Sequence, residues 1–235
     1  MLKAYRDHAA ERTALGLPPL PLNAEQTTAL SELLKSPPAG EESFLIDLLE
    51  NRIPAGVDDA AKAKAAFLSD IANGRTSSPL VSPQHAVRLL GTMLGGYNVT
   101  ALIELLDTAL AADAAMALKR TTLIFDAFQQ VADRMQAGNA HAKSLIQSWA
   151  EGEWFTAKPA LAETIKTVVF KVPGETNTDD LSPAQAAWSR PDIPLHAKEM
   201  LVAKMPDGLD TIAKLKEKNL PIAYVGDVVG TGSSR

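Results

Sequence analysis

The first 155 or so residues form a series of short stretches with helical periodicity, separated by turns rich in proline and glycine. Helix starts are well marked, because Asn23 and Gln26 have the spacing of a capping box and Ser82 precedes a proline suited to the first helical position. No convincing strand interrupts the series. Such a segment folds by packing helix against helix, so we expect stacked antiparallel pairs in a HEAT-like array, with a plain helical bundle as the alternative.

Glycines and prolines set the limits of these expected helices. The longest, 112–135, is interpreted as one helix that ends before Gly138. The others span 2–15, from 23 to the prolines at 37 and 38, 41–51, from about 58 to 74, from 82 toward the glycines at 95 and 96, 99–106, and 140–151.

The pattern changes after Pro159. A strand is expected over residues 164–172, with Val168, Phe170 and Val172 on one of its sides. Helices are expected at 194–203 and 209–218, and a second strand begins at Ile222. This order is typical of an α/β arrangement. We therefore expect a multidomain chain, with an all-α HEAT-like domain over residues 1–157 followed by part of an α/β domain over 160–235.

Two polar loops follow the two expected strands. Residues 174–183 are too rich in turn formers to continue the first strand, and Gly226 is expected to begin a tight turn after the second. The second loop ends in Ser233, Ser234 and Arg235, groups suited to binding a small carboxylate or phosphate; the alternative is a flexible tail. If the strands are parallel, both loops lie at one edge of the sheet.

Composition restricts the chemistry of the chain. A net charge of -5 gives no general reason to expect nucleic-acid binding, and with no cysteine there is no thiolate to ligate an iron–sulfur cluster. The four histidines lack the spacing of ligands on one helix face, so we expect no metal site. No run is apolar enough for a membrane span, and the charged N-terminal residues are unlike a signal peptide, so we expect a cytoplasmic protein.

Three motifs bring out a family resemblance. The combination of residues 174–183 (GETNTDDLSP), 187–196 (AWSRPDIPLH) and 226–235 (GDVVGTGSSR) resembles the aconitase B family. The last of these motifs resembles the active-site loop in the swivelling domain of the aconitase superfamily. The helical region, with 37–42 (PPAGEE) and 95–98 (GGYN), resembles the aconitase B family, in which a helical domain precedes the swivelling domain. The resemblance implies a lyase of the tricarboxylic acid cycle that interconverts citrate and isocitrate through cis-aconitate, and that also dehydrates 2-methylisocitrate.

The resemblance also implies site residues. Ser233 matches the base that moves a proton on the substrate, while Ser234, Arg235 and Arg190 match residues that bind it. Asp179 matches an aspartate that supports a catalytic partner from another domain, with loop capping as the alternative. For Arg190 the alternative is an ordinary surface arginine.

The family carries a 4Fe-4S cluster on cysteines in later domains, so the resemblance implies that this chain is an N-terminal fragment, binds no cluster and is inactive alone. It implies a homodimer or other protein partners through the helical domain, and mRNA binding by the cluster-free protein. The alternative function is accordingly a dimerisation or RNA-binding helical module without catalysis. A further possibility is the small subunit of an isopropylmalate isomerase, against which the long helical region counts.

Overall fold

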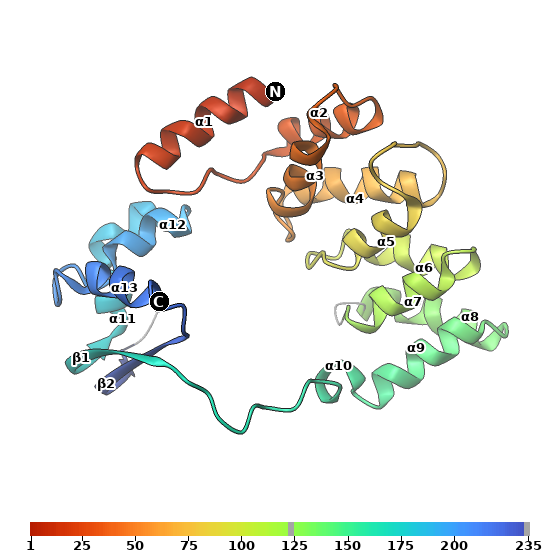
Figure 1. Ribbon diagram of the computed structural model, residues 1–235. Coiled ribbons are helices and arrows are strands. Elements are labelled where there is room, and N and C mark those ends of the chain that lie inside the picture. Colours follow the sequence, from red (N-terminus) through yellow and green to blue (C-terminus); the bar gives the residue numbers. More distant parts are fainter. Residues whose placement is uncertain (122–124, 233–235) are drawn as a thin grey trace. The chain divides into compact units, whose positions relative to one another are not determined.

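The computed structural model of the chain describes residues 1–121 and 125–232, and it divides into two compact units (Figure 1). The first comprises Met1–Arg6 and Leu20–Pro159, and the second comprises Asp7–Pro19 and Ala160–Arg235. Helix α1 (Leu2–Ala14) therefore begins in the first unit and ends in the second. We call them the helical unit and the α/β unit and describe each separately.

The helical unit is a succession of helices joined by short turns, as Figure 1 shows. After α1, the helices are α2 (Ala24–Lys35), α3 (Glu42–Asn51), α4 (Asp59–Ala72), α5 (Pro83–Leu90), α6 (Val99–Glu104) with η1 (Leu105–Asp107), α7 (Ala111–Lys119), η2 (Phe125–Ala127) with α8 (Phe128–Gln136), α9 (Ala140–Ala150) and α10 (Glu153–Thr156).

The predicted helix starts are confirmed at two places. The Asn23 side chain accepts a hydrogen bond from the Gln26 backbone while the Gln26 side chain accepts one from the Asn23 backbone, which completes the capping box of α2. Ser82 accepts a hydrogen bond from the backbone of His85 at the start of α5. Asp58 precedes α4, but its side chain makes no capping hydrogen bond. The helices enclose one continuous core in which leucines such as Leu30, Leu68 and Leu102 are fully buried.

The single long helix expected at 112–135 is wrong. Helix α7 ends at Lys119, and α8 begins only at Phe128. At the break the amides of Arg120 and Thr121 bond to carbonyls three residues earlier, and the Thr121 hydroxyl bonds to the Ala117 carbonyl. This tightened turn ends the α-helical hydrogen bonding of α7. The apolar periodicity of residues 112–135 continues across the break and therefore does not indicate where α7 ends.

The α/β unit contains two parallel strands, β1 (Val168–Asn177) and β2 (Ile222–Thr231), which form a two-stranded sheet in the described residues. The sequence left the strand direction open, and the parallel pairing meets the condition under which both polar loops lie at one edge of the sheet. The connection between them carries α11 (Thr178–Leu181), η3 (Ala184–Ser189), α12 (Ile193–His196), η4 (Ala197–Glu199) and α13 (Gly208–Lys216). The coarse prediction of a helical region followed by an α/β region therefore agrees with the structure.

Both strands continue past the C-terminal ends that the sequence predicts, although β1 begins at Val168 and not at residue 164. The polar stretch after Val172 does not leave the sheet, because a bulge between Val172 and Glu175 absorbs an extra residue and pairing resumes up to Asn177. Gly174 sits in this bulge with φ of +74°, where its amide donates to the Asp227 carboxylate at 2.7 Å. Gly226 likewise pairs with Val172 inside β2 and does not begin a tight turn.

The helix expected at 194–203 is shorter than predicted. After η4 the chain reaches Leu201, whose φ of +63° is left-handed and incompatible with a continued helix. The Leu201 amide donates to the Asp180 carbonyl at 2.7 Å, and the side chain is buried with Phe170 and Val172 of β1. The left-handed backbone that buries the Leu201 side chain against the sheet therefore ends the helix before residue 203.

In the described ranges, 1–121 and 125–232, no helix combines the length and the apolar character that a membrane span requires.

Candidate functional site

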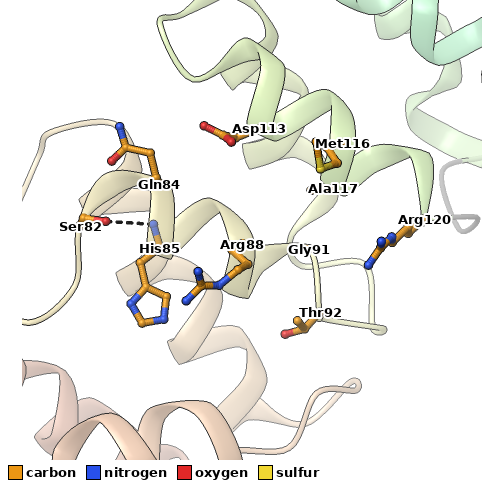
Figure 2. A pocket seen from close by; sticks show the side chains of 10 residues that line it. All are labelled: Ser82, Gln84, His85, Arg88, Gly91, Thr92, Asp113, Met116, Ala117 and Arg120. Atoms are coloured by element: carbon orange, nitrogen blue, oxygen red, sulfur yellow. Dashed lines mark hydrogen bonds between the residues drawn. The ribbon is translucent and has the colours of Figure 1, made fainter. Parts of the chain in front are cut away.

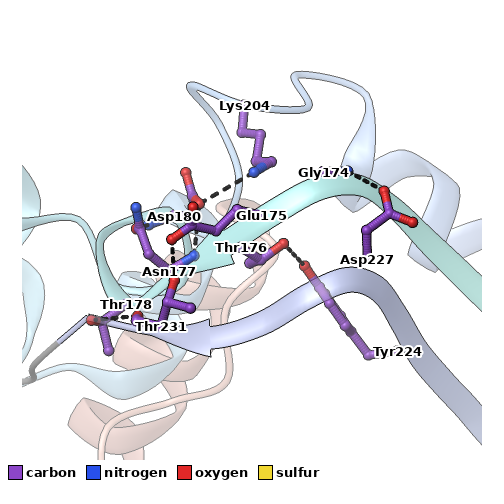
Figure 3. A network of polar contacts seen from close by, with 10 residues as sticks. All are labelled: Gly174, Glu175, Thr176, Asn177, Thr178, Asp180, Lys204, Tyr224, Asp227 and Thr231. Atoms are coloured by element: carbon purple, nitrogen blue, oxygen red, sulfur yellow. Dashed lines mark hydrogen bonds and ion pairs between the residues drawn. The ribbon is translucent and has the colours of Figure 1, made fainter.

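The carboxyl ends of the two strands meet at one edge of the sheet. Asn177, which ends β1, pairs with Thr231, which ends β2 (Figure 3). The Thr178 hydroxyl reaches the Thr231 carbonyl at 3.5 Å, and Thr231 in turn donates to the Glu175 carboxylate. The two polar loops expected from the sequence therefore begin side by side, an arrangement suited to ligand binding in α/β folds.

A capping box fixes the first of these loops. The Asn177 side chain accepts from the Asp180 amide at 3.0 Å, and the Asp180 carboxylate accepts from the Asn177 amide at 2.9 Å. Lys204 approaches the same carboxylate at 3.5 Å. These contacts hold the backbone of α11 at the end of β1, with its first turn facing the second loop.

The second loop passes close to α11. A Cβ atom at Gly232 would lie 2.8 Å from the Thr178 hydroxyl oxygen, and the φ of Gly232 is +88°. Only glycine adopts this conformation in this space without strain. The chain is therefore brought against the first loop just before Ser233.

Two hydrogen bonds behind this edge brace the sheet. Tyr224 donates to the hydroxyl of buried Thr176 at 3.1 Å, and Asp227 accepts from the Gly174 amide, as Figure 3 shows. Both contacts join β1 to β2. They limit the freedom of the strand ends to separate.

The predicted site residues divide into two groups. Ser233, Ser234 and Arg235 lie outside the described residues. Arg190 and Asp179 are described and exposed, and Arg190 donates to the Ser182 carbonyl at 3.5 Å. The Asp179 side chain makes no hydrogen bond or ion pair within residues 1–121 and 125–232, and the capping box of α11 consists of Asn177 and Asp180. The site roles of all five remain predictions.

Three residues beside Arg190 were not singled out from the sequence. His196 bonds through its two ring nitrogens to Ser182 and Ser189. Nothing in the spacing of these residues marks them as a network. They come together because α11, η3 and α12 fold back on one another.

An ion pair connects α1 with the start of α12 inside the α/β unit. Arg12 binds both oxygens of Asp192, at 2.6 and 3.0 Å, and Asp192 also accepts from the Leu195 amide. The side chains are only 11% and 18% exposed. Hydrogen bonding by Arg12, with the help of the Leu195 amide and the charge of Arg12, lowers the pKa of Asp192 although desolvation acts to raise it.

The helical unit has a surface pocket of its own. Figure 2 shows His85 and Arg88 on α5, with Asp113 on α7 and Arg120 just after that helix. His85 is held by Glu50 at 2.8 Å. Arg190 and Asp179, the two predicted site residues that the structure describes, do not line this pocket. Because side chains of both charge signs surround it, its lining does not indicate one class of ligand.

The residues of this chain do not fit an iron–sulfur cluster. The chain contains no cysteine. Across the part of the chain that the structure describes, no group of three or more histidine, aspartate or glutamate side chains is arranged to hold a metal ion.

Comparison with known proteins assigns a family to both parts of the chain. Residues 4–155 match the aconitate B N-terminal domain, and residues 167–235 match the aconitate hydratase 2 N-terminus. The chain is 61% identical over 248 residues to aconitate hydratase B of Pseudomonas aeruginosa, 62% over 238 residues to that of Synechocystis, and 57% over 247 residues to that of Escherichia coli. Each comparison covers 100% of this chain but only 27% or 28% of the relative.

Proposed function

The chain belongs to the aconitase B family, and from this premise we propose that it supplies the N-terminal portion of an aconitate hydratase. The reaction is the interconversion of citrate and isocitrate through cis-aconitate, with 2-methylisocitrate dehydration as a second activity. In this proposal residues 1–157 form a HEAT-like domain, and residues 160–235 begin the swivelling α/β domain.

The observation that carries the proposal is the meeting of the two strand ends. Asn177 and Thr231 are partners, and Gly232 lies against Thr178. The backbone thus leads the loop that continues to Ser233 past the loop that carries Asp179. This convergence supports a shared site, because groups from both loops start from one edge of the sheet.

The chemistry of the proposed residues fits a tricarboxylate. Arg190 presents an exposed planar guanidinium, which can bind a carboxylate through two hydrogen bonds. Ser233 takes or returns the proton on the substrate carbon, and Ser234 and Arg235 bind the substrate. A serine hydroxyl ionises far above neutral pH, so its alkoxide needs stabilisation by Arg235 and backbone N–H donors.

The 4Fe-4S cluster of the family has its ligands outside this chain in this proposal, because the chain has no cysteine. Asp179 is proposed to support a catalytic group from another domain. The exposure of Asp179 supports this role, because an exposed carboxylate is accessible to a group from another domain.

Steady-state kinetics of the complete enzyme that carries this chain test the proposal. Arg190→Ala should raise KM for the tricarboxylate about tenfold or more, since it removes a charge-assisted contact, and Ser233→Ala should lower kcat by about a hundredfold or more. Matched controls are Arg120→Ala, an exposed arginine of the helical unit, and Ser144→Ala, an exposed serine of α9. Wild-type kinetics in both Arg190→Ala and Ser233→Ala would refute the site.

Protein association is a second role that one observation favours. Trp154 and Phe155 on α10 are 53% and 61% exposed and pack edge to face on one another. Large exposed aromatic side chains are typical of interfaces. We propose association through the helical domain, to a homodimer or another protein, and Trp154→Ser with Phe155→Ser should abolish a concentration-dependent mass change in ultracentrifugation. If the double variant has the same mass distribution as the wild type, these aromatic side chains do not mediate association.

RNA binding gains no support from the net charge of -5.

A further inference from the structure

His196 connects two serines, one just before η3 and one at its end. Its Nε2 lies 2.8 Å from the Ser182 hydroxyl oxygen, and its Nδ1 lies 2.8 Å from the Ser189 hydroxyl oxygen. Ser182 follows α11, and Ser189 ends η3 and is only 1% exposed. The imidazole therefore cross-links the two ends of the segment between these serines.

The direction of each hydrogen bond follows from counting protons. The Ser189 oxygen lies 2.7 Å from the Ala186 carbonyl, which has no proton, so the hydroxyl donates there. With its one proton used, Ser189 accepts from the Nδ1–H of His196. In the neutral imidazole Nε2 then carries the lone pair and accepts from the Ser182 hydroxyl. The result is a one-way chain from Ser182 through His196 and Ser189 to a backbone carbonyl.

The position of Arg190 depends on both serines that the His196 hydrogen bonds connect. It directly follows Ser189, so the buried serine fixes the point from which its side chain starts. Its Nη2 donates to the carbonyl of Ser182 at 3.5 Å. Within residues 1–121 and 125–232 this is the one hydrogen bond of the Arg190 guanidinium, and no ion pair holds it. A guanidinium held this way keeps its remaining donors for a ligand.

We propose that His196 is a positioning residue of the substrate site: by tying Ser182 to Ser189, it holds the Arg190 guanidinium in the orientation that binds a substrate carboxylate. This inference rests on the proposed function, in which Arg190 binds the tricarboxylate. His196 itself touches no substrate. Its loss therefore weakens binding through Arg190 and leaves the proton transfer at the substrate carbon unaffected.

A double-mutant cycle in the complete enzyme that carries this chain is the test. His196→Ala should raise KM for the tricarboxylate about tenfold while kcat stays within about twofold. In an Arg190→Ala background the same substitution should change KM by less than about twofold, because no guanidinium is left to position. The control is His141→Ala on the exposed face of α9, which should leave KM unchanged in both backgrounds.

Each outcome separates this inference from the proposed function. An equal rise in KM with and without Arg190 would show that His196 acts only by general stabilisation, and would overturn the inference. Unchanged KM in Arg190→Ala alone would instead refute the proposed role of Arg190, and the inference with it. If His196→Ala fails to fold, Ser182→Ala removes only the hydroxyl end of the chain, and the same non-additivity with Arg190→Ala is expected.

The tautomer of His196 supplies a readout that needs no activity. Long-range nitrogen–proton NMR spectra of this chain should show neutral His196 with its proton on Nδ1, and Ser189→Ala should abolish that preference. A neutral ring protonated on Nε2 would contradict the proton count on which the positioning rests.

Discussion

Asn177 and Thr231 are the last residues of β1 and β2, and they are partners across the parallel pair. Each strand contains an irregularity in its pairing, yet the two end together. Because side chains and loops at this edge start from a common line, a ligand can contact both loops at once. The proposed function depends on this convergence of the strand ends.

A substitution at Gly232 tests whether activity depends on the close approach of the two loops. Gly232→Ala places a Cβ 2.8 Å from the Thr178 hydroxyl oxygen at a φ of +88°, so it should lower kcat/KM of the complete enzyme by about tenfold or more. Gly230→Ala is the matched control, since its φ of +83° imposes similar strain but nothing lies within 4 Å. Equal effects of the two substitutions would mean that strain alone, and not the approach to Thr178, affects activity.

The Arg12–Asp192 pair should make the stability of the α/β unit depend on pH. The pKa of Asp192 is lowered from its ordinary value of 3.8, so the contribution of the pair is complete above that pH and is lost as the pH falls through the lowered pKa. Asp192→Asn should reduce the free energy of unfolding at neutral pH by about 1 kcal/mol. In urea titrations its difference from wild type should shrink below pH 3.8, whereas exposed Glu163→Gln should show little difference at neutral pH. A deficit that does not change with pH would argue against the ion pair as its cause.

Gly95 marks a close contact between backbones in the helical unit. A Cβ there would lie 2.0 Å from the Gly56 carbonyl oxygen, and the Leu94 amide holds the two segments together at the Ala55 carbonyl, 2.7 Å away. Gly95→Ala should therefore reduce the free energy of unfolding by about 3 kcal/mol. Gly56→Ala meets its nearest atom at 3.7 Å without a positive φ, so its unfolding midpoint should change little or rise slightly. Similar midpoints for the two variants would show that this contact relaxes easily.

Lys64 is a charge buried in α4, only 3% exposed. Desolvation lowers its pKa from 10.5, partly offset by the charge of Glu50. Because the pKa of this basic group is lowered on folding, burying its charge reduces the free energy of unfolding. This reduction is complete below the lowered pKa and disappears as the pH rises toward 10.5. Lys64→Met should stabilise the protein by about 1 kcal/mol at neutral pH, with a smaller gain near pH 10. Exposed Lys62→Met should give no such gain, and a loss of stability in Lys64→Met would mean that the ammonium is well solvated or paired.

Sequence patterns predict those helix starts that are determined by neighbouring residues. The capping box at Asn23 and the start at Ser82 are confirmed because each is complete within a few residues of sequence. Boundaries set by distant contacts were missed. The extension of β1 needs Asp227 to accept from Gly174, and the end of the helix before Leu201 needs the carbonyl of Asp180. Neither partner can be recognised from the sequence around the boundary.

The candidate site shows the same division. The sequence predicts that the strand ends meet if the strands are parallel, and the structure supplies that parallel order. The His196 network, by contrast, depends on the folded positions of Ser182 and Ser189. The family resemblance assigned roles to Arg190 and Asp179 without revealing what holds them. The structure adds that the capping box of α11 pairs Asn177 with Asp180 and does not involve Asp179.

The most direct test of the central claim is aconitate hydration after this chain is mixed with a separately produced, cluster-loaded remainder of the enzyme. We predict activity that neither part has alone. This activity should be lost when the chain carries Ser233→Ala or Arg190→Ala, but not when it carries Ser144→Ala. Activity that arises on mixing and is undiminished by both site substitutions would contradict the claim that the loops of this chain bind and deprotonate the substrate.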